Sequence, residues 1–501
     1  MIDAEAEGAR GLPRPGLLIG LIAVSSAAAL MLEIVAGRLV APYLGMSLHS
    51  WTAIIAVVLA GLSLGALLGG RLADDPLERG RGRLVGALGL AALFTLLSPV
   101  LLRRTAAWTE AGDLGPTVEV LVVASVMLFV PSVFAGLVSP IATRLALAQT
   151  PAAGTGRLLG WIFAAGAAGS IVGTLLAGFV LIGLLGSLKS ILLIAALYGL
   201  AALSVLPRDR RALPSLMVLL LACGSAWAAG RTIDAWRTPC LAESAYSCIR
   251  LDGFNAPGGG TARLLVIDHL PHGANIDTVP DRFVMAYLDL ADRLARHRFD
   301  GVPPTSFFLG GGAYTLPRAW LADGGAVTVA EIDPLVTATA ERHLWLERSP
   351  TLDVLHTDAR RALARMPAAA RYDVIFGDAF QDVTVPPHLV TREFAERVRD
   401  RLAADGLYMV NVIDRAERPA FAAAVARTLE TTFPAVTVWR ESTAGSGERR
   451  VNHLIVASTA PLELDEVRSG PPFARRWAPV TLDVAGPVLT DDYSPVERLL
   501  H

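Results

Sequence analysis

Several short polar motifs in the second half of the sequence contain residues that could bind a nucleoside. Gly310-Gly311-Gly312 follows an apolar run, and Glu331 stands about 20 residues further on. Glycines without Cβ atoms let a ligand approach the backbone and the positive start of a following helix. A carboxylate at the end of the next strand can accept hydrogen bonds from two ribose hydroxyls. The spacing therefore favours nucleoside binding, and a solvated acid at a strand end is the alternative for Glu331.

Two more acids follow short apolar runs further along the chain. Asp358, in Asp358-Ala359, could bond the amino group of an adenine, and Asp378 could accept a proton from an attacking amine or orient it. Either acid alone is equally well explained as a loop or helix-capping residue. All four motifs together predict a nucleoside ligand.

A regular alternation of strands and helices must position these residues. Short apolar strands separated by amphipathic helices predict a parallel sheet with helices on both faces, a Rossmann-like α/β domain over 301–501. Ligands of such sheets bind at the carboxyl ends of the strands, where the four motifs lie. The strands are expected at 305–309, 326–331, 352–355, 372–377 and 406–413, and the helices at 315–322, 334–346, 358–366 and 391–403.

Residues 231–300 read as a small β-hairpin subdomain. Two strand-like runs, 246–251 and 262–267, are separated by a turn-rich segment at 255–260, and a helical segment follows at about 280–297.

The first 230 residues predict a polytopic helical membrane domain. The chain is 53% hydrophobic and 18% charged, and few of the charges fall between residue 16 and about 230. Small residues at four-residue spacing, Gly61 with Gly65 and Gly169 with Gly173, would let helices approach closely in lipid. About seven segments are long enough to span a membrane: 16–40, 49–72, 84–102, 117–147, 158–184, 187–206 and 213–230.

Two ionisable residues, Glu33 and Arg38, lie in the first span. Such residues usually face the interior of a bundle or lie near the headgroups. Arg38 lies near the end of the span, and Glu33 is either functional or a structural partner of a basic group.

The distribution of basic residues predicts that the N-terminus lies inside, which with seven spans puts the C-terminal half outside. A cytoplasmic supply of nucleotide cofactors favours the opposite side, so both orientations remain open. The N-terminal side carries Arg10, Arg14, Arg71, Arg79, Arg81, Arg83, Arg144, Arg157, Arg208, Arg210 and Arg211; the other side carries Arg103, Arg104 and Lys189.

The cysteines, histidines and net charge exclude several classes of site. Three cysteines are too few for a disulfide-rich scaffold or a four-cysteine zinc site, although Cys240 and Cys248 could pair in an oxidising compartment. His269 and His272 lack a third ligand nearby, so no metal is expected. A net charge of −2 gives no reason to invoke nucleic acid.

Over roughly 240–460 the sequence resembles the spermidine synthase (polyamine aminopropyltransferase) branch of the Rossmann-like methyltransferase fold. The whole chain resembles the membrane-fused members found in bacteria. The motifs that match are Leu309-Gly310-Gly311-Gly312, Glu331-Ile-Asp-Pro, Asp358-Ala359, Tyr372-Asp-Val-Ile-Phe-Gly-Asp378, Glu243-Ser-Ala-Tyr246, Leu265-Val-Ile-Asp268 and Tyr287.

The resemblance implies transfer of an aminopropyl group from decarboxylated S-adenosylmethionine to an amine such as putrescine. It implies that Asp378 is the base and that the glycines, Glu331 and Asp358-Ala359 bind the nucleoside. It further implies that Tyr246, His272, Tyr287 and Asp382 lie at the amine site. A multi-pass protein of the bacterial inner membrane is expected, in contact with lipid and able to form homo-oligomers.

The sequence departs from the family at several site positions. Ala313 stands where the family has an aspartate that receives the amine of the aminopropyl arm. Ser247 and His272 stand where the family has glutamines, and its second acid has moved to Asp382 or vanished.

Loss of the carboxylate at 313 removes a partner for the cationic aminopropyl arm of decarboxylated S-adenosylmethionine. It also removes a negative charge that would repel the carboxylate of intact S-adenosylmethionine. Intact S-adenosylmethionine, used by a methyltransferase or lyase, therefore remains an alternative donor. A transporter that senses a nucleoside is the second alternative, because GGRLADDPLERGRGR at 69–83 resembles a basic loop of major facilitator transporters.

Overall fold

The chain folds into two compact units, Met1–Cys248 and Ile249–His501. A computed structural model describes residues 12–112, 114–207, 213–380, 385–442 and 450–500.

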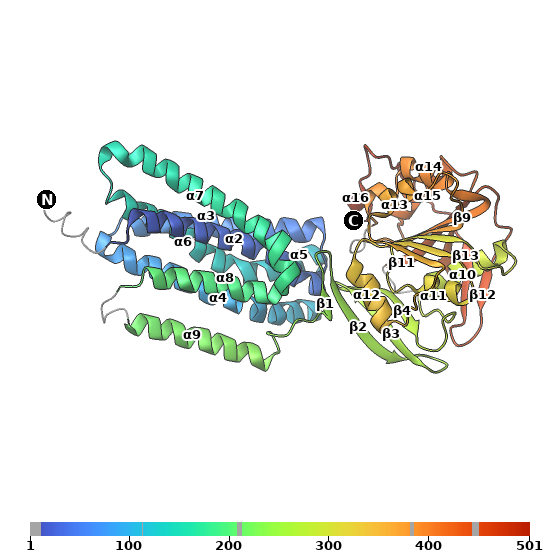
Figure 1. Cartoon of the computed structure of the whole chain (residues 1–501), viewed down its shortest axis with the longest axis horizontal. Coiled ribbons are helices and arrows are strands. Elements are labelled where there is room, and N and C mark those ends of the chain that lie inside the picture. The colour runs from blue at the N-terminus through green and yellow to red at the C-terminus, as the bar shows by residue number, and fades with distance from the viewer. Residues whose placement is uncertain (1–11, 113, 208–212, 381–384, 443–449, 501) are drawn as a thin grey trace. The chain divides into compact units, whose positions relative to one another are not determined.

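Long apolar helices make up most of the first unit (Figure 1). Ser47 caps α3 by accepting a hydrogen bond from the Ser50 amide, and Pro15 begins α2. The helices are α2 (Pro15–Leu44), α3 (Leu48–Ala73), α4 (Leu77–Ala111), α5 (Pro116–Ala124), η1 (Ser125–Phe129), α6 (Val130–Leu147), η2 (Ala152–Gly154), α7 (Thr155–Leu176), η3 (Ala177–Leu181), α8 (Ile182–Ser204) and α9 (Leu213–Thr232).

The glycine pairs with four-residue spacing lie where helices approach closely. A Cβ atom on Gly65 would lie 2.1 Å from the Val133 carbonyl oxygen on α6. A Cβ atom on Gly173 would lie 2.3 Å from the Ala27 carbonyl oxygen on α2. The close approach predicted from small-residue spacing is confirmed at both pairs.

By length and composition, five helices within the described residues are able to cross a membrane, against seven predicted. They are Pro15–Leu44, Leu48–Ala73, Leu77–Ala111, Thr117–Leu147 and Ala152–Ser204. The fifth contains two of the predicted spans, and Gly186 between them has a non-helical backbone with φ 75° and ψ 171°. The seventh predicted span corresponds to α9. Its stretch Met217–Thr232 is a shorter apolar helix and is not among the five.

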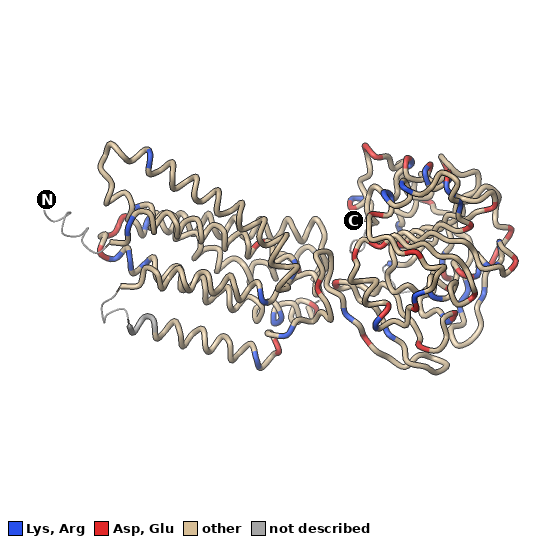
Figure 2. The backbone as a smooth tube through the Cα atoms, viewed as in Figure 1, with Lys and Arg blue, Asp and Glu red and all other residues tan. Residues whose placement is uncertain are grey.

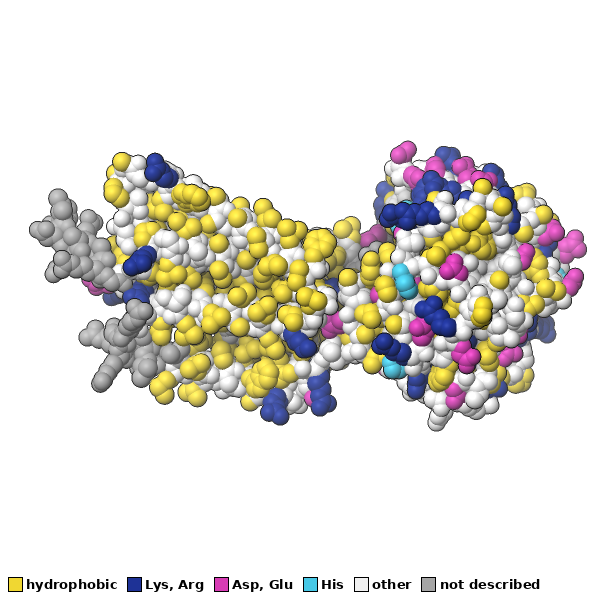
Figure 3. Space-filling view, viewed as in Figure 1, with side chains coloured by type: hydrophobic (Ala, Val, Ile, Leu, Met, Phe, Trp, Pro, Cys, Tyr) yellow, Lys and Arg dark blue, Asp and Glu magenta, His cyan; other side chains and the backbone are white. Residues whose placement is uncertain are grey.

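Many large apolar side chains lie exposed on the surface of the bundle, as expected for helices in contact with lipid. Large apolar side chains such as Phe163 and Phe179 are 74% and 83% exposed. Hydrophobic side chains cover most of the visible face of the bundle (Figure 3). Charged residues gather toward the ends of the helices (Figure 2). Both features suit helices surrounded by lipid.

Cys240 and Cys248 form a disulfide in the first unit, with their Cα atoms 5.3 Å apart. The pairing that the sequence left open is therefore present.

A nine-stranded sheet forms the centre of the second unit, in the order β12-β13-β10-β11-β9-β8-β5-β6-β7. The run from β9 to β7 is parallel, and the remaining strands pair antiparallel. The strands are β5 (Ser306–Leu309), β6 (Val327–Ala330), β7 (Leu352–Leu355), β8 (Tyr372–Gly377), β9 (Leu402–Arg415), β10 (Ala435–Glu441), β11 (Arg450–Ser458), β12 (Val467–Ser469) and β13 (Arg475–Pro479).

Helices on both faces of this sheet bury two apolar layers. Phe307 and Phe308 are consecutive on β5 and point to opposite faces, so each belongs to a different buried cluster. The predicted α/β architecture is confirmed. The helices are α10 (Ala286–Arg298), α11 (Thr315–Ala322), α12 (Pro334–His343), α13 (Ala359–Arg365), α14 (Arg392–Arg399), α15 (Ala420–Glu430) and α16 (Val496–Leu500).

A smaller antiparallel sheet precedes α10. Strand β2 (Cys248–Asn255) pairs with β3 (Thr261–Ile267), which pairs with β4 (Leu270–Ile276). The turn between β2 and β3 lies in the glycine-rich segment from which the hairpin was predicted, and Gly258 and Gly259 there have positive φ.

Candidate functional site

The three glycines form a tight turn at the carboxyl end of β5. Gly310 has φ 91° and Gly312 has φ 50°, which are left-handed values that favour glycine. Gly311 is required for a different reason, because a Cβ atom there would lie 2.4 Å from Cε2 of Tyr314. The Tyr314 hydroxyl is held by Thr337, 2.7 Å away. The loop therefore has a fixed shape that depends on glycine at all three positions.

Glu331 is buried beside this loop, with 7% of its surface exposed. Its Oε2 accepts a hydrogen bond from the Gly311 amide and its Oε1 accepts one from the Asp333 amide, both at 2.8 Å. Burial raises the pKa of the carboxyl, while the amide bonds lower it. The alternative of a solvated acid is therefore wrong. The Gly312 amide also bonds to this carboxylate, so of its roughly four acceptor positions about one remains open to a ligand.

Asp358 caps α13, and Ala359 is buried at the start of that helix. The Asp358 carboxylate accepts from the Arg361 amide at 2.9 Å and lies 2.7 Å from Nε2 of His388. The capping role is thus present, and the contact with adenine stays a prediction. His388 was not singled out from the sequence, because it lies in a proline-rich loop without a motif.

Asp378 follows β8 and is held by two side chains from distant segments. Its Oδ2 accepts a hydrogen bond from Tyr287 on α10 at 2.8 Å, and its Oδ1 accepts one from Asn411 on β9 at 2.9 Å. Burial raises the pKa of Asp378 to about 6, although both hydrogen bonds lower it. A carboxyl with this pKa is largely ionised at pH 7 and still able to accept a proton.

Asn411 was missed in the sequence reading, as was Asn452, which donates to the Asn411 side-chain oxygen at 2.9 Å. Asn411 is buried, with 1% of its surface exposed. An asparagine inside the apolar run Tyr408–Val412 was the available signal. Asn452 lies on β11, and only the antiparallel pairing of β11 with β9 brings it close.

Tyr287 acts as the hydrogen-bond donor in this group. Burial, and then the negative charge of Asp378, raise the pKa of Tyr287 well above its usual value. The phenol therefore keeps its proton and orients the Asp378 carboxylate.

A small, partly open cavity adjoins Asp378 and the glycine loop, and its lining includes His272, Ala313 and Thr315. Nδ1 of His272 lies 2.8 Å from the Leu270 carbonyl oxygen and must donate to it, which leaves Nε2 as an acceptor. Burial lowers the pKa of His272, so the ring is neutral. Ala313 is 2% exposed and faces Gly273, where a Cβ atom would lie 2.7 Å from that of Ala313. Among the described residues, Asp378 is the only acid in the lining of this cavity.

For two further residues, Tyr246 and Asp382, a position at the amine site stays a prediction. Tyr246 belongs to the first unit, is 53% exposed, and its carbonyl oxygen accepts from Arg38. Asp382 lies outside the described residues. Within the described part of the chain, no group of three His, Cys, Asp or Glu side chains is arranged to hold a metal ion.

Comparison with known proteins gives matches over parts of the chain, while no family model matches. The polyamine aminopropyltransferase of Vibrio vulnificus (strain CMCP6) is 35% identical over 104 residues, which cover 21% of this chain and 35% of that protein. Over these residues the chain is similar to that polyamine aminopropyltransferase. It spans about a third of the length of the Vibrio relative.

Two further proteins are similar to parts of this chain. An N-terminal histidine N-methyltransferase of Emericella nidulans is 30% identical over 139 residues, covering 27% of this chain and 24% of that protein. The crystal structure of a probable spermidine synthase from Corynebacterium glutamicum ATCC 13032 is 25% identical, with a TM-score of 0.39, and covers 43% of this chain and 78% of that one.

Proposed function

We propose that this protein is a membrane-bound transferase that moves an aminopropyl group from decarboxylated S-adenosylmethionine to an amine such as putrescine. The observation that carries the proposal is the ionisable Asp378, held by Tyr287 and Asn411 at the strand end next to the glycine loop. Homology to the Vibrio aminopropyltransferase supports the reaction class.

The glycine loop and Glu331 bind the nucleoside part of the donor in this proposal. The glycine turn lets the donor approach closely, and a remaining acceptor position of Glu331 takes a ribose hydroxyl. The Gly310 and Gly311 amides already donate to the Ala330 carbonyl oxygen and to Glu331. Asp358 and Ala359 are assigned to the adenine end, with the His388 contact as the bond that adenine would compete with.

Chemistry then requires a neutral amine next to the sulfonium-bound carbon. The amine nitrogen attacks that carbon, the carbon–sulfur bond breaks, and its electron pair stays on sulfur to give a neutral thioether. Asp378 accepts the proton that the nitrogen loses, while Tyr287 and Asn411 keep both carboxylate oxygens oriented.

A second donor is favoured by one specific observation. Ala313 gives the cavity beside Asp378 and the glycine loop an uncharged wall, and the His272 ring in the same lining is neutral. Intact S-adenosylmethionine, which carries a carboxylate, therefore meets less repulsion here than it would beside an aspartate at 313.

For the membrane part we propose seven crossings within 1–230, counting one on each side of Gly186 and one at α9. Residues 231–300 form a hairpin subdomain and 301–501 the catalytic domain. In a bacterial inner membrane, the basic residues of the N-terminal side put the chain after α9 outside. The disulfide between Cys240 and Cys248 supports the same side, because such bonds persist in oxidising compartments. The donor must then be delivered to that side.

Calorimetry of the purified full-length protein with decarboxylated and intact S-adenosylmethionine tests the proposal. Mass analysis of products with putrescine then identifies the transferred group. Failure of both donors to bind would overturn the enzyme assignment, and binding without turnover of any amine would favour nucleoside sensing.

A further inference from the structure

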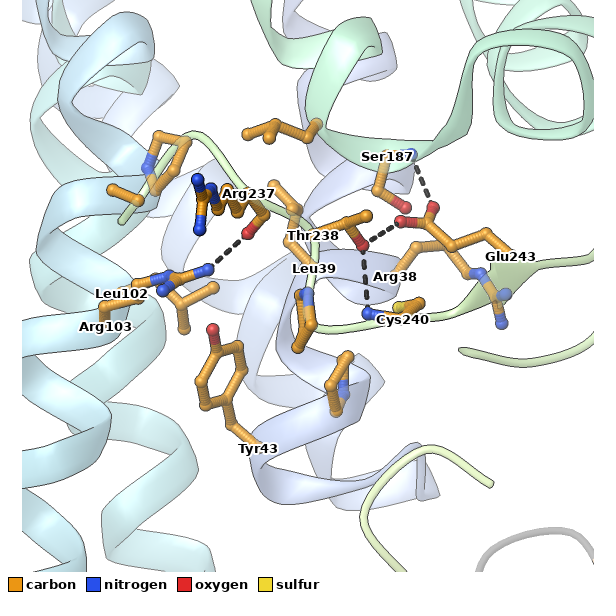
Figure 4. A pocket seen from close by; sticks show the side chains of 15 residues that line it. Arg38, Leu39, Tyr43, Leu102, Arg103, Ser187, Arg237, Thr238, Cys240 and Glu243 are labelled. Atoms are coloured by element: carbon orange, nitrogen blue, oxygen red, sulfur yellow. Dashed lines mark hydrogen bonds between the residues drawn. The ribbon is translucent and has the colours of Figure 1, made fainter. Parts of the chain in front are cut away.

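A second, partly open cavity lies at one end of the helices in the first unit (Figure 4). Its lining comes from α2, α4, the segment after Gly186 and the stretch 235–243, which follows α9. Apolar side chains form part of the wall, namely Leu39, Pro42, Leu102 and Leu188. The cavity thus has a partly apolar wall, and the charged side chains in its lining are Arg38, Arg103, Arg237 and Glu243.

Two arginines in this lining donate only to neutral groups. Arg38 donates to the carbonyl oxygens of Tyr246 at 2.6 Å and Ser244 at 3.0 Å. Its Nε is buried and has no hydrogen-bond partner. Arg103 donates to the carbonyl oxygens of Ile233, at 3.2 Å, and Arg237. Carbonyl groups satisfy donors without cancelling the charge, so both guanidinium charges remain.

The one carboxylate in the lining is already engaged elsewhere. Oε2 of Glu243 accepts from the Ser187 amide at 2.7 Å and Oε1 accepts from the Thr238 hydroxyl at 2.8 Å, as Figure 4 shows. Within the described residues, no carboxylate lies within 4.0 Å of the Arg38 or Arg103 guanidinium. A third arginine, Arg237, has a 3.6 Å contact with Asp234, but both side chains are mostly exposed. The lining therefore carries a net positive charge.

Aromatic residues mark this end of the helices as the level of the lipid headgroups. Trp227 and Trp236 stack with ring centres 4.6 Å apart, and Trp108 on α4, close after Arg103, is 62% exposed. Tryptophan is enriched where a membrane meets water. Lipid phosphates lie at that level.

We propose that this cavity binds the phosphate of an anionic phospholipid headgroup. Arginine fits phosphate oxygens because its planar guanidinium offers several donors, and Arg38 and Arg103 keep uncancelled charge for one. The apolar wall suits the start of an acyl chain. A membrane that is rich in anionic lipid would then stabilise the end of the bundle from which the rest of the chain continues.

Native mass spectrometry of the full-length protein, titrated with phosphatidylglycerol and with phosphatidylcholine of the same acyl chains, tests this site. We expect tighter binding of phosphatidylglycerol, reduced about fivefold by Arg103→Gln and by Arg237→Gln, which corresponds to about 1 kcal/mol for each basic residue near the lipid. Arg104→Gln is the matched control, because Arg104 is the exposed neighbour of Arg103 and is absent from the lining.

Arg103→Gln also removes two bonds to carbonyl groups, so thermal unfolding in phosphatidylcholine nanodiscs checks its fold. Arg237→Gln keeps the test valid if Arg103→Gln is unstable, because the Arg237 side chain is 82% exposed. Equal losses in Arg104→Gln, or no preference for phosphatidylglycerol, would overturn the proposal. Binding of inorganic phosphate that depends on these arginines, without any such dependence for the lipid, would also overturn it.

Discussion

The Tyr287 hydroxyl lies 2.8 Å from Oδ2 of Asp378, although 91 positions separate the two residues in the chain. The phenol comes from α10, before the first strand of the large sheet, and the acid follows the fourth. With the Asn411 bond on the other oxygen, the carboxylate is fixed in a buried position. Its pKa of about 6 suits a group that must accept a proton near neutral pH.

Asp378→Asn should abolish turnover and leave donor binding nearly unchanged. The amide keeps the shape of the side chain but cannot accept the amine proton, so we expect kcat to fall by about 10²- to 10⁴-fold. Product formation by mass spectrometry and donor affinity by calorimetry measure the two effects. Asp353→Asn, at an exposed position on β7, is the control and should behave like the unmodified protein. A variant at 378 with ordinary turnover would remove Asp378 from the mechanism.

The pH dependence of kcat should reveal the Asp378 carboxyl directly. Only the ionised form accepts a proton, so kcat should rise with pH around a midpoint near 6. The hydrogen bond from Tyr287 lowers this pKa, and its removal in Tyr287→Phe should move the midpoint to higher pH. Tyr493→Phe, at an exposed tyrosine, should not move it. A downward shift in Tyr287→Phe would contradict the assigned role of the phenol.

Most of the α/β architecture was predictable, because short apolar runs and amphipathic segments alternate locally in the sequence. The residues at the strand ends, Gly310–Gly312, Glu331 and Asp378, were predictable for the same reason. Asn411 and Asn452 were not, since their contact depends on the antiparallel pairing of β11 with β9. The number of spans was also harder to predict, because hydropathy does not distinguish one long helix from two that meet at Gly186.

Ala313→Asp should shift donor preference toward the decarboxylated form. A carboxylate at 313 would repel the carboxylate of intact S-adenosylmethionine and attract a cationic arm, and the opposed charges should change the affinity ratio at least about tenfold. Calorimetry with both donors measures the ratio. Ala313→Asn is the control for size, since the site is tightly packed against Gly273. An equal change in both variants would show that volume, and not charge, controls the preference.

Glu331→Gln should weaken binding of either donor by about 10- to 100-fold, because hydrogen bonds to a charged group contribute about 1.5–3 kcal/mol. The amide nitrogen of glutamine would also face the Gly311 or Asp333 amide, both donors, and loosen the loop. Calorimetry with an adenosyl thioether measures the loss without any turnover. Glu347→Gln, at an exposed position, should have no effect. Unchanged affinity in Glu331→Gln would contradict a ribose-binding role.

The side of the membrane can be tested with single cysteines in a Cys240→Ser, Cys248→Ser, Cys223→Ala background. Seven crossings and an external disulfide require Arg79→Cys, in the first turn of α4, to be protected from an impermeant maleimide in intact cells. Glu347→Cys in the second unit should react under the same conditions once the outer envelope is made permeable. Because both sites are exposed, their labelling differs only if a membrane separates them. Reaction at position 79 with protection at 347 would instead put the site on the cytoplasmic side, where the donor is made.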